Sequence, residues 1–358
     1  MTRLPRYFLL SLLLVLLLAA CNSTASTQQS GATPTSAVTP SPTAAKPIAQ
    51  LSAPVLTYKG HAGAVIGVVW SPNGKQIASA SDDGTVQLWN AATGKRAWTY
   101  TYSAGGPKFL FAVAWSPDGR LIAAGGQGGA VVVLDAVTGH VVATYYSYSI
   151  AIEGIAWSPD SKHLAFGLQG DNSVRVWDIA SKKQIIDYTG HTDSVNRIAW
   201  SPDGTEIAAA SYDGTVQVLN AASGQRLLTY NVGTPLWSIA WSPDGKQIVT
   251  GTGAAGMDYP VSSGNMVRVF DAATGKTLLT YTGQSGNVYA AAWSPNGQYI
   301  ASGGGDKTVR IWNATTGQTM LIGKGFTDLV WDTAWSPDGK ELAACSQDGT
   351  IQVWRVSL

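Results

Sequence analysis

The chain has 358 residues, and only 13 % of them are charged, with 23 lysines and arginines against 22 aspartates and glutamates. A chain so close to neutrality offers no basic stripe to neutralise phosphates, which argues against nucleic acid as a partner. Its two cysteines and four histidines form no cluster with ligand spacing, so neither a metal site nor a cofactor is expected.

The first 20 residues predict a secretory signal peptide. Arg3 and Arg6 form a short basic region, and residues 8–18 are an almost unbroken apolar run, too short to span a bilayer comfortably. The run ends in Leu-Ala-Ala followed by Cys21, which resembles the lipobox of bacterial lipoproteins. The resemblance implies that Cys21 carries a diacylglycerol group and anchors the protein to the bacterial cell envelope, outside the cytoplasm. The alternative is an ordinary signal peptide with an incidental cysteine.

Residues 21–53 are predicted to be the lipidated cysteine and a disordered tether. Ser, Thr, Ala, Pro and Gln dominate this stretch, and Lys46 is its only charged residue. Such a composition cannot bury enough apolar surface to fold. We therefore expect one folded domain, over residues 54–358.

A short phrase returns seven times in this domain: Trp-Ser-Pro, then Asp or Asn, then usually Gly. The spacings between its tryptophans are 45, 42, 43, 41, 52 and 42 residues, a period that indicates repeated supersecondary units. The tryptophans are Trp70, Trp115, Trp157, Trp200, Trp241, Trp293 and Trp335.

Two further markers accompany the phrase. Most repeats end in an apolar residue followed by Asp or Asn, as at Trp89-Asn90 and Trp177-Asp178, and a Gly-His pair precedes two of them, at positions 60–61 and 190–191. Together the markers resemble the WD40 repeat family over roughly residues 54–358. The resemblance implies an all-β fold, a seven-bladed β-propeller.

Each repeat predicts four strands. In the first repeat these are Val65–Trp70, Gln76–Ser81, Val86–Trp89 and Lys95–Tyr100. The Ser-Pro-Asn-Gly that follows Trp70 suits a type I turn, since proline presets φ at the second position and glycine relieves the last. Four-stranded sheets of this kind, arranged radially, make a propeller.

The two ends of the domain predict how the ring closes. The last repeat stops after its third strand, Thr350–Arg355. Pro54–Tyr58 matches the outer strands at 227–230 and 278–281, so we expect it to pair into the last sheet. This pairing would remove an exposed edge.

WD40 blades often share a buried hydrogen-bonded tetrad of His, Ser or Thr, Asp and Trp. The fourth repeat keeps His191 and Asp213 but has Ala209 and Leu219 at the other two positions. We predict a structural brace in the first repeat, and no catalytic triad. Only that repeat carries the complete set, at His61, Ser79, Asp83 and Trp89.

The position four residues before each inner-strand tryptophan lies at the start of that strand, near the central opening. The resemblance implies that this rim is the docking surface, and clustered aromatic side chains are typical interface anchors. The alternative is that these side chains plug the opening and pack on one another. After Ile66 in the first repeat, the predicted partner-binding residues are Phe111, Glu153, Asn196, Trp237, Tyr289 and Trp331.

Two further features are expected on the same face of the propeller as this rim. The 52-residue interval in the fifth repeat reflects a longer loop around Gly253–Asn265, which we predict to serve recognition. Charged inner-strand residues, namely Glu153, Arg197 and Asp332, are expected to line the channel.

The sequence therefore predicts a membrane-tethered, non-catalytic propeller that binds a protein or peptide. One alternative is a propeller enzyme, lactonase-like or quinone-dependent, but such enzymes need clustered acidic or histidine ligands that this sequence supplies poorly. Another alternative is a lipoprotein that scaffolds the assembly of the cell envelope.

Overall fold

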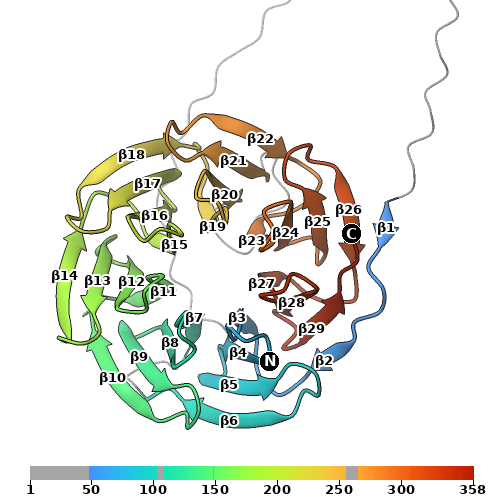
Figure 1. Cartoon of the computed structure of the whole chain (residues 1–358), viewed down its shortest axis with the longest axis horizontal. Helices are drawn as coiled ribbons and strands as arrows, with labels where there is room; N and C mark the ends of the chain where they lie inside the picture. Colours follow the sequence, from blue (N-terminus) through green and yellow to red (C-terminus); the bar gives the residue numbers. More distant parts are fainter. Residues whose placement is uncertain (1–47, 104–108, 148, 255–264) are drawn as a thin grey trace, which may run out of the picture. The chain divides into compact units, whose positions relative to one another are not determined.

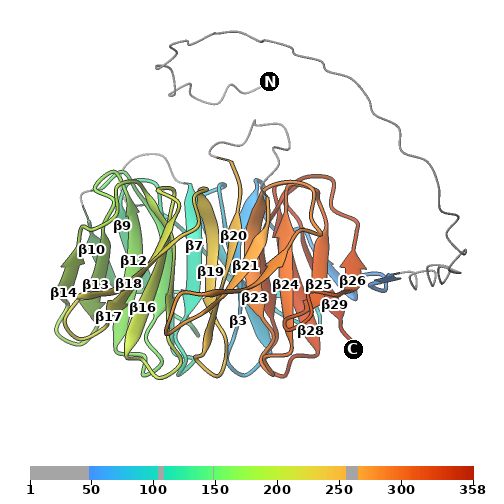
Figure 2. The same cartoon turned by 90° about the horizontal axis from the view of Figure 1, so that it is seen from above.

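The computed structural model describes residues 48–103, 109–147, 149–254 and 265–358. Within these residues the regular structure is entirely β, with 29 strands in seven sheets. The sheets are arranged radially around a central axis (Figure 1), and their strands run between the two faces of the ring (Figure 2). The predicted seven-bladed propeller is confirmed. The predicted signal peptide, Cys21 and the predicted tether up to residue 47 lie outside the described residues.

The two inner strands of each blade carry the turn phrase between them. The innermost strands are β3 (Val65–Trp70), β7 (Leu110–Trp115), β11 (Ala151–Trp157), β15 (Val195–Trp200), β19 (Leu236–Trp241), β23 (Val288–Trp293) and β27 (Val330–Trp335). The second strands are β4 (Gln76–Ser81), β8 (Leu121–Gly126), β12 (His163–Gln169), β16 (Glu206–Ser211), β20 (Gln247–Thr252), β24 (Tyr299–Gly304) and β28 (Glu341–Ser346).

The two outer strands complete each blade, and blades 1 to 7 are numbered in the order of their innermost strands. The third strands are β5 (Thr85–Asn90), β9 (Ala130–Asp135), β13 (Val174–Asp178), β17 (Thr215–Asn220), β21 (Val267–Asp271), β25 (Val309–Asn313) and β29 (Ile351–Arg355). The outer strands are β6 (Arg96–Thr101), β10 (Val141–Tyr146), β14 (Lys183–Tyr188), β18 (Arg226–Asn231), β22 (Thr277–Tyr281), β26 (Thr319–Gly323) and β2 (Leu56–Tyr58).

The hydrophobic core lies between successive blades. Ala78 and Leu88 of blade 1, for example, pack with Leu110 and Ile122 of blade 2. The second strands are rich in small residues, and β4 is fully buried from Ile77 to Ser81. Small side chains let neighbouring twisted sheets approach closely.

The residues of the turn phrase hold the turn and join neighbouring blades. Ser71 Oγ donates to Asn73 Oδ1 (2.8 Å) and accepts from the Gln76 amide (2.9 Å), so each turn is held by its own residues. Trp70 Nε1 donates to the carbonyl of Ala334 in the preceding blade (3.0 Å). The same bond to the preceding blade is made by Trp157, Trp200, Trp241 and Trp335.

The ring closes as predicted. β2 pairs antiparallel with β29, with Leu56 opposite Val353 and Tyr58 opposite Ile351. Inside the ring, the Val68 amide of blade 1 donates to the carboxylate of Asp332 in blade 7 (3.1 Å). The seam is therefore held at both its inner and outer ends.

One strand lies inside the segment predicted as tether. β1 (Ala49–Gln50) pairs parallel with the outer edge of β26, with Ala49 opposite Leu321 and the Leu51 amide bonded to the Ile322 carbonyl (2.9 Å). The predicted domain boundary at residue 54 is thus too late, because backbone pairing needs no apolar run of its own. Figure 1 shows this strand outside blade 6, leading into β2 of blade 7.

Candidate functional site

The predicted binding residues sit where the innermost strands begin, on the rim of the central opening. Phe111, Glu153 and Trp237 are partly exposed there. The other three are buried: Asn196 is 2 % exposed, Tyr289 3 % and Trp331 8 %. The last two therefore cannot serve as the exposed anchors that the sequence suggested.

The buried aromatic side chains pack against one another across blades 5, 6 and 7. The ring of Tyr289 lies 4.9 Å from that of Trp237, edge to face, and 4.5 Å from that of Trp331. Tyr212 adds a fourth ring, 4.9 Å from Trp237. Edge-to-face contacts are favourable because the positive ring edge meets the negative ring face. For Tyr289 and Trp331, the alternative prediction of packing near the axis describes the structure.

Hydrogen bonds fix two of these buried residues. Trp331 Nε1 donates to Gln347 Oε1 (2.7 Å), and Asn196 Nδ2 donates to the Leu236 carbonyl of the next blade (2.6 Å). Asn196 thus links blades 4 and 5 through its Nδ2, while its Oδ1 is buried without a hydrogen-bond partner among the described residues. Trp237 Nε1 is likewise buried without a hydrogen-bond partner in the described part of the chain.

The sequence reasoning missed two exposed apolar residues of the rim, Phe109 and Ile150. Their carbonyls both accept hydrogen bonds from the turn after β8, from Gln127 (2.9 Å) and Gly128 (3.0 Å). They therefore flank one turn, on either side of the boundary between blades 2 and 3. Phe109 lies just before β7, two residues from the predicted Phe111, so its place in the sequence was the available signal that it lies near the rim.

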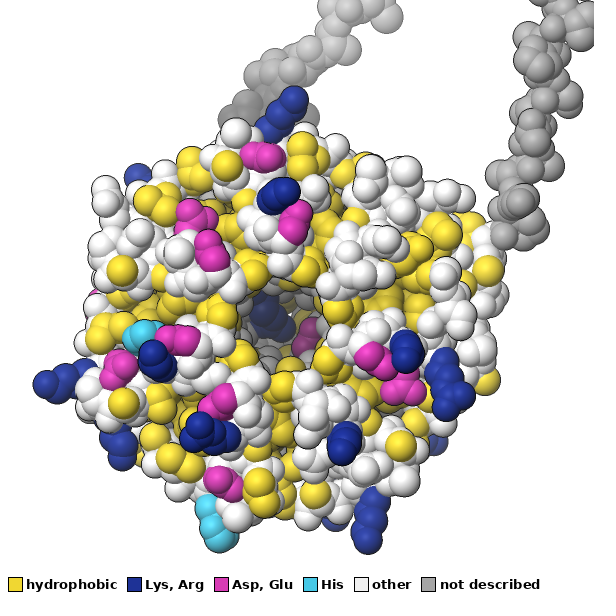
Figure 3. All heavy atoms as spheres, viewed as in Figure 1, with side chains coloured by type: hydrophobic (Ala, Val, Ile, Leu, Met, Phe, Trp, Pro, Cys, Tyr) yellow, Lys and Arg dark blue, Asp and Glu magenta, His cyan; other side chains and the backbone are white. Residues whose placement is uncertain are grey.

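The charged residues of the innermost strands lie around the channel. Figure 3 shows basic and acidic side chains inside the central opening. Arg197 Nη1 donates to the carbonyl of Glu153 (2.6 Å), which ties blade 4 to blade 3. Burial raises the pKa of the Glu153 carboxyl, and burial raises the pKa of Asp332 to about 6, while Arg197 opposes both shifts.

The tetrad of blade 1 forms a continuous hydrogen-bonded chain. Trp89 Nε1 donates to Ser79 Oγ (3.3 Å), Ser79 Oγ lies 2.8 Å from His61 Nε2, and His61 Nδ1 lies 3.0 Å from Asp83 Oδ2. Ser79 and Trp89 are fully buried. A serine in this position cannot reach a substrate, so the trio with histidine and aspartate is a brace.

Glycine is required beside this histidine. A side chain on Gly60 would collide with the ring of Tyr58, and the same holds for Gly190 beside Tyr188. Tyr58 in turn stacks on Trp89, with ring centroids 4.5 Å apart. This close approach is the physical reason for the Gly-His marker.

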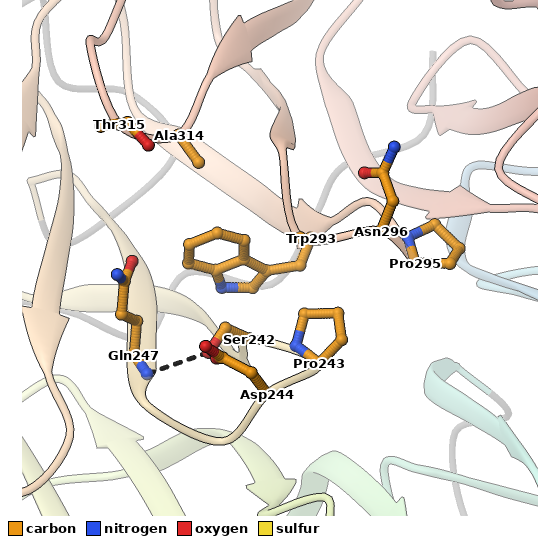
Figure 4. A pocket seen from close by; sticks show the side chains of 10 residues that line it. Ser242, Pro243, Asp244, Gln247, Trp293, Pro295, Asn296, Ala314 and Thr315 are labelled. Atoms are coloured by element: carbon orange, nitrogen blue, oxygen red, sulfur yellow. Dashed lines mark hydrogen bonds between the residues drawn. The ribbon is translucent and has the colours of Figure 1, made fainter.

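A cavity of about 190 Å³ opens between blades 5 and 6 among the turn residues. Figure 4 shows Trp293 at its centre, with Pro243 and Asp244 on one side and Pro295 and Asn296 on the other. Its lining repeats the turn phrase of the other blades, with no grouping that suits catalysis. Nor does any set of three or more His, Cys, Asp or Glu side chains in the described ranges have the geometry to hold a metal ion.

Comparison with known families agrees with the architecture. The family model described as "WD domain, G-beta repeat" matches seven segments, at residues 52–90, 98–135, 139–178, 182–220, 224–271, 275–313 and 317–355. The chain belongs to the WD40 family. These matches cover most of the chain and contain the third strand of every blade.

Individual relatives resemble this WD40 propeller over different lengths. "Ribosome biogenesis protein erb1" of Neurospora crassa is 38 % identical over 65 residues, and that of Aspergillus clavatus 38 % over 68 residues. These matches span 18 and 19 % of this chain and only 8 % of each relative. "Eukaryotic translation initiation factor 3 subunit I" of Culex quinquefasciatus is 26 % identical over 267 residues, which is 70 % of this chain and 80 % of the relative.

Proposed function

We propose that this WD40 propeller is a non-catalytic scaffold that binds a protein or peptide at its rim. The observation that carries this proposal is the apolar exposure beside the boundary of blades 2 and 3, where Phe109 and Ile150 are exposed and Phe111 is partly exposed. Soluble proteins rarely expose clustered large apolar side chains without a partner for them. Trp237, whose side chain is partly exposed, extends the surface to blade 5.

Charge supports recognition at the same rim. Glu153 and Arg197 lie on the innermost strands of blades 3 and 4, and backbone carbonyls engage a single nitrogen of Arg197. Aromatic anchors bordered by charged side chains are typical of protein interfaces. The names of the relatives concern ribosome biogenesis and translation initiation, and one is a subunit by name, so work within an assembly suits this chain too.

The proposed location follows from residues 1–21 alone. A signal peptide over residues 1–20, followed by a lipidated Cys21, would place the propeller outside the cytoplasm, anchored by acyl chains to a bacterial membrane. Two or more acyl chains hold a protein firmly, at about 0.8 kcal/mol per buried methylene. The described residues, for their part, include no helix with the length and apolarity to cross a bilayer.

The test compares partner capture by the full chain and by a Phe111→Ala/Trp237→Ala variant, after cross-linking in native membranes. Loss of two anchors should weaken capture at least tenfold, since a central interface anchor contributes about 2 kcal/mol or more. Leu278→Ala, on the exposed outer strand of blade 5, is the matched control and should capture normally.

The same preparation tests the anchor. Cys21→Ser should move the propeller from the membrane fraction to the soluble fraction, and mass spectrometry should find acyl groups on the mature N-terminus of the wild type. An unmodified terminus would contradict the location. Equal capture by the double variant, with unchanged thermal unfolding, would contradict the binding site.

A further inference from the structure

The outer strands of the propeller differ in how their free edges are protected. An edge strand offers unpaired N–H and C=O groups to any other strand, and lysine, arginine or proline at the edge discourages such pairing. In five blades the outer edge of the outer strand is free of any other described strand, and the strand carries one of these residues at or just before its start. They are Arg96 (β6), Lys183 (β14), Arg226 (β18), Lys276 (before β22) and Pro54 (before β2). β26 carries none, and its outer side is covered by β1.

β10, the outer strand of blade 2, has neither form of protection. It runs from Val141 to Tyr146 without a charged residue or a proline, and no described strand pairs with its outer side. Val141 and Val142 are each 48 % exposed, and Tyr146 is 56 % exposed. The outer edge of β10 is therefore apolar, and neither a charged residue nor another described strand protects it.

A cavity of about 350 Å³ lies beside this edge, lined by β10 residues together with Trp177 and Lys182 of blade 3. The cavity exists because β10 has a small residue where other outer strands have a large one. On other outer strands, the side chains of Leu56, Trp98, Ile186 and Leu279 pack against a glycine in the next blade's turn. In blade 2 the corresponding residue is Ala143, and the turn residue opposite is Lys182, in a left-handed conformation with φ 55°.

Two residues that line this cavity, Tyr145 and Trp177, each have a polar atom without a partner in the described ranges. Tyr145 packs on Trp177 with ring centroids 4.6 Å apart, and both the tyrosine hydroxyl and the indole N–H are buried without a hydrogen bond among the described residues. Comparable pairs elsewhere are satisfied. Tyr58 donates to Gln87 (2.6 Å), and Trp312, which stacks on Tyr281, donates to Ser302 (3.1 Å). Leaving buried polar groups unpaired costs stability, so this part of blades 2 and 3 is less well satisfied than the corresponding pairs elsewhere.

The chain itself shows what kind of segment covers such an edge. β1 belongs to the uncharged stretch Ile48-Ala-Gln-Leu51, which lies extended along β26 and places Leu51 against the cluster around Trp354. Backbone pairing supplies the affinity in this mode of recognition, and pockets for alternate side chains supply the specificity.

We propose that the edge of β10 and the cavity over Ala143 bind an extended strand of a partner protein. The strand pairs with β10 by its backbone, inserts one bulky apolar side chain over Ala143, and places an acidic residue beside Lys182, the one charged residue that lines the cavity. This site is separate from the rim, and the proposal does not depend on the binding function proposed there.

A synthetic peptide tests the proposal. The probe is a short fluorescein-labelled peptide that alternates valine and threonine around a central leucine and carries a glutamate near one end; a second peptide has proline in place of the leucine. Fluorescence anisotropy with the full chain should show binding of the first peptide only. Exchange of the glutamate for lysine should weaken it, because of Lys182.

Two variants locate the site. Val142→Lys gives β10 the charge that other outer strands carry, and Ala143→Leu fills the cavity as Leu279 does in blade 5; each should weaken peptide binding about tenfold or more. Leu227→Lys, at the corresponding exposed position of β18, is the matched control and should bind normally. The Phe111→Ala/Trp237→Ala variant should also bind normally, which separates this proposal from the rim.

Three results would overturn the proposal. One is equal peptide binding by wild type, Val142→Lys and Ala143→Leu, with all three folded by thermal unfolding. Another is the absence of peptide binding to the wild type. The third is a wild-type dimer in light scattering that becomes a monomer in Val142→Lys, which would assign the edge to a second copy of this chain.

Discussion

Blades 1 and 4 hold the same histidine–aspartate pair in two different surroundings. In blade 1, Ser79 joins His61 to Trp89. In blade 4, Ala209 and Leu219 take the places of the serine and tryptophan, and His191 Nε2 is buried without a partner, although His191 Nδ1 still lies 2.8 Å from Asp213.

The comparison separates two tasks within the tetrad. In both blades the aspartate also accepts a backbone amide, from Ala62 (2.9 Å) or Thr192 (3.1 Å), so it fastens the loop before the innermost strand to the turn after the second. The serine and tryptophan extend this chain into the core. Loss of both the serine and the tryptophan leaves only the histidine Nε2 unpaired, as in blade 4. Loss of the serine alone would also leave the tryptophan Nε1 unpaired, so replacing both residues costs fewer hydrogen bonds than replacing the serine alone.

The largest effect is expected for Ser79→Ala, which brings blade 1 halfway to blade 4. It leaves His61 Nε2 and Trp89 Nε1 buried without this partner and should destabilise the propeller by about 2 kcal/mol. Urea unfolding followed by tryptophan fluorescence measures the loss. Ser302→Ala in blade 6 is the control, where only Trp312 loses its bond and about half the loss is expected. Equal losses of stability in Ser79→Ala and Ser302→Ala would contradict a contribution from the bond between Ser79 and His61.

The reverse change should repair blade 4. Ala209→Ser places a hydroxyl where it can donate to His191 Nε2, and we expect a gain of about 1 kcal/mol in the free energy of unfolding. Its neighbour Ala208 is equally buried but lies on the opposite face of β16, so Ala208→Ser should destabilise instead. A loss of stability in Ala209→Ser would show that the site cannot accommodate the hydroxyl.

The smallest effect appears only in acid, and it should be the same in both blades. Burial alone would raise the pKa of Asp83 and of Asp213, but hydrogen bonds from the histidine and threonine hold each pKa below its ordinary value of 3.8. A lowered folded-state pKa gives stability that is complete above the unfolded-state pKa and is lost as the pH falls through the folded-state pKa.

Asp83→Asn and Asp213→Asn should therefore each flatten the loss of stability below about pH 4, and to a similar extent. The measurement is the urea midpoint as a function of pH. A change confined to blade 1 would mean that the serine and tryptophan, and not the shared histidine and threonine, control the carboxyl.

Most of the fold could be predicted from the sequence. The predicted strands of the first repeat agree with β3 to β6 within one residue at each end, because turn residues and alternating apolar residues are local signals. The pairing of Pro54–Tyr58 into the last blade could be predicted as well, because the same residues recur in the outer strands of complete repeats.

The candidate site was only partly predictable. Position along a strand placed seven residues on the rim, but it could not separate the partly exposed Phe111 from the buried Tyr289. That difference depends on the neighbours in the ring, since Tyr289 has aromatic residues on both sides, in blades 5 and 7. The predicted recognition loop around Gly253–Asn265 is described only at its ends, because residues 255–264 lie outside the described part.

The amino-acid sequence by itself determined the number of blades, the turns and the closure of the ring by Pro54–Tyr58, because these follow from residues that recur at fixed spacing. It also determined the tetrad of blade 1, because all four residue types stand at the family's positions in that repeat. Only the tertiary structure decided which rim side chains stay exposed, that β1 covers β26, and that Ala143 leaves a cavity beside an unguarded edge. These depend on contacts between neighbouring blades, where one small or large side chain changes the space left by another.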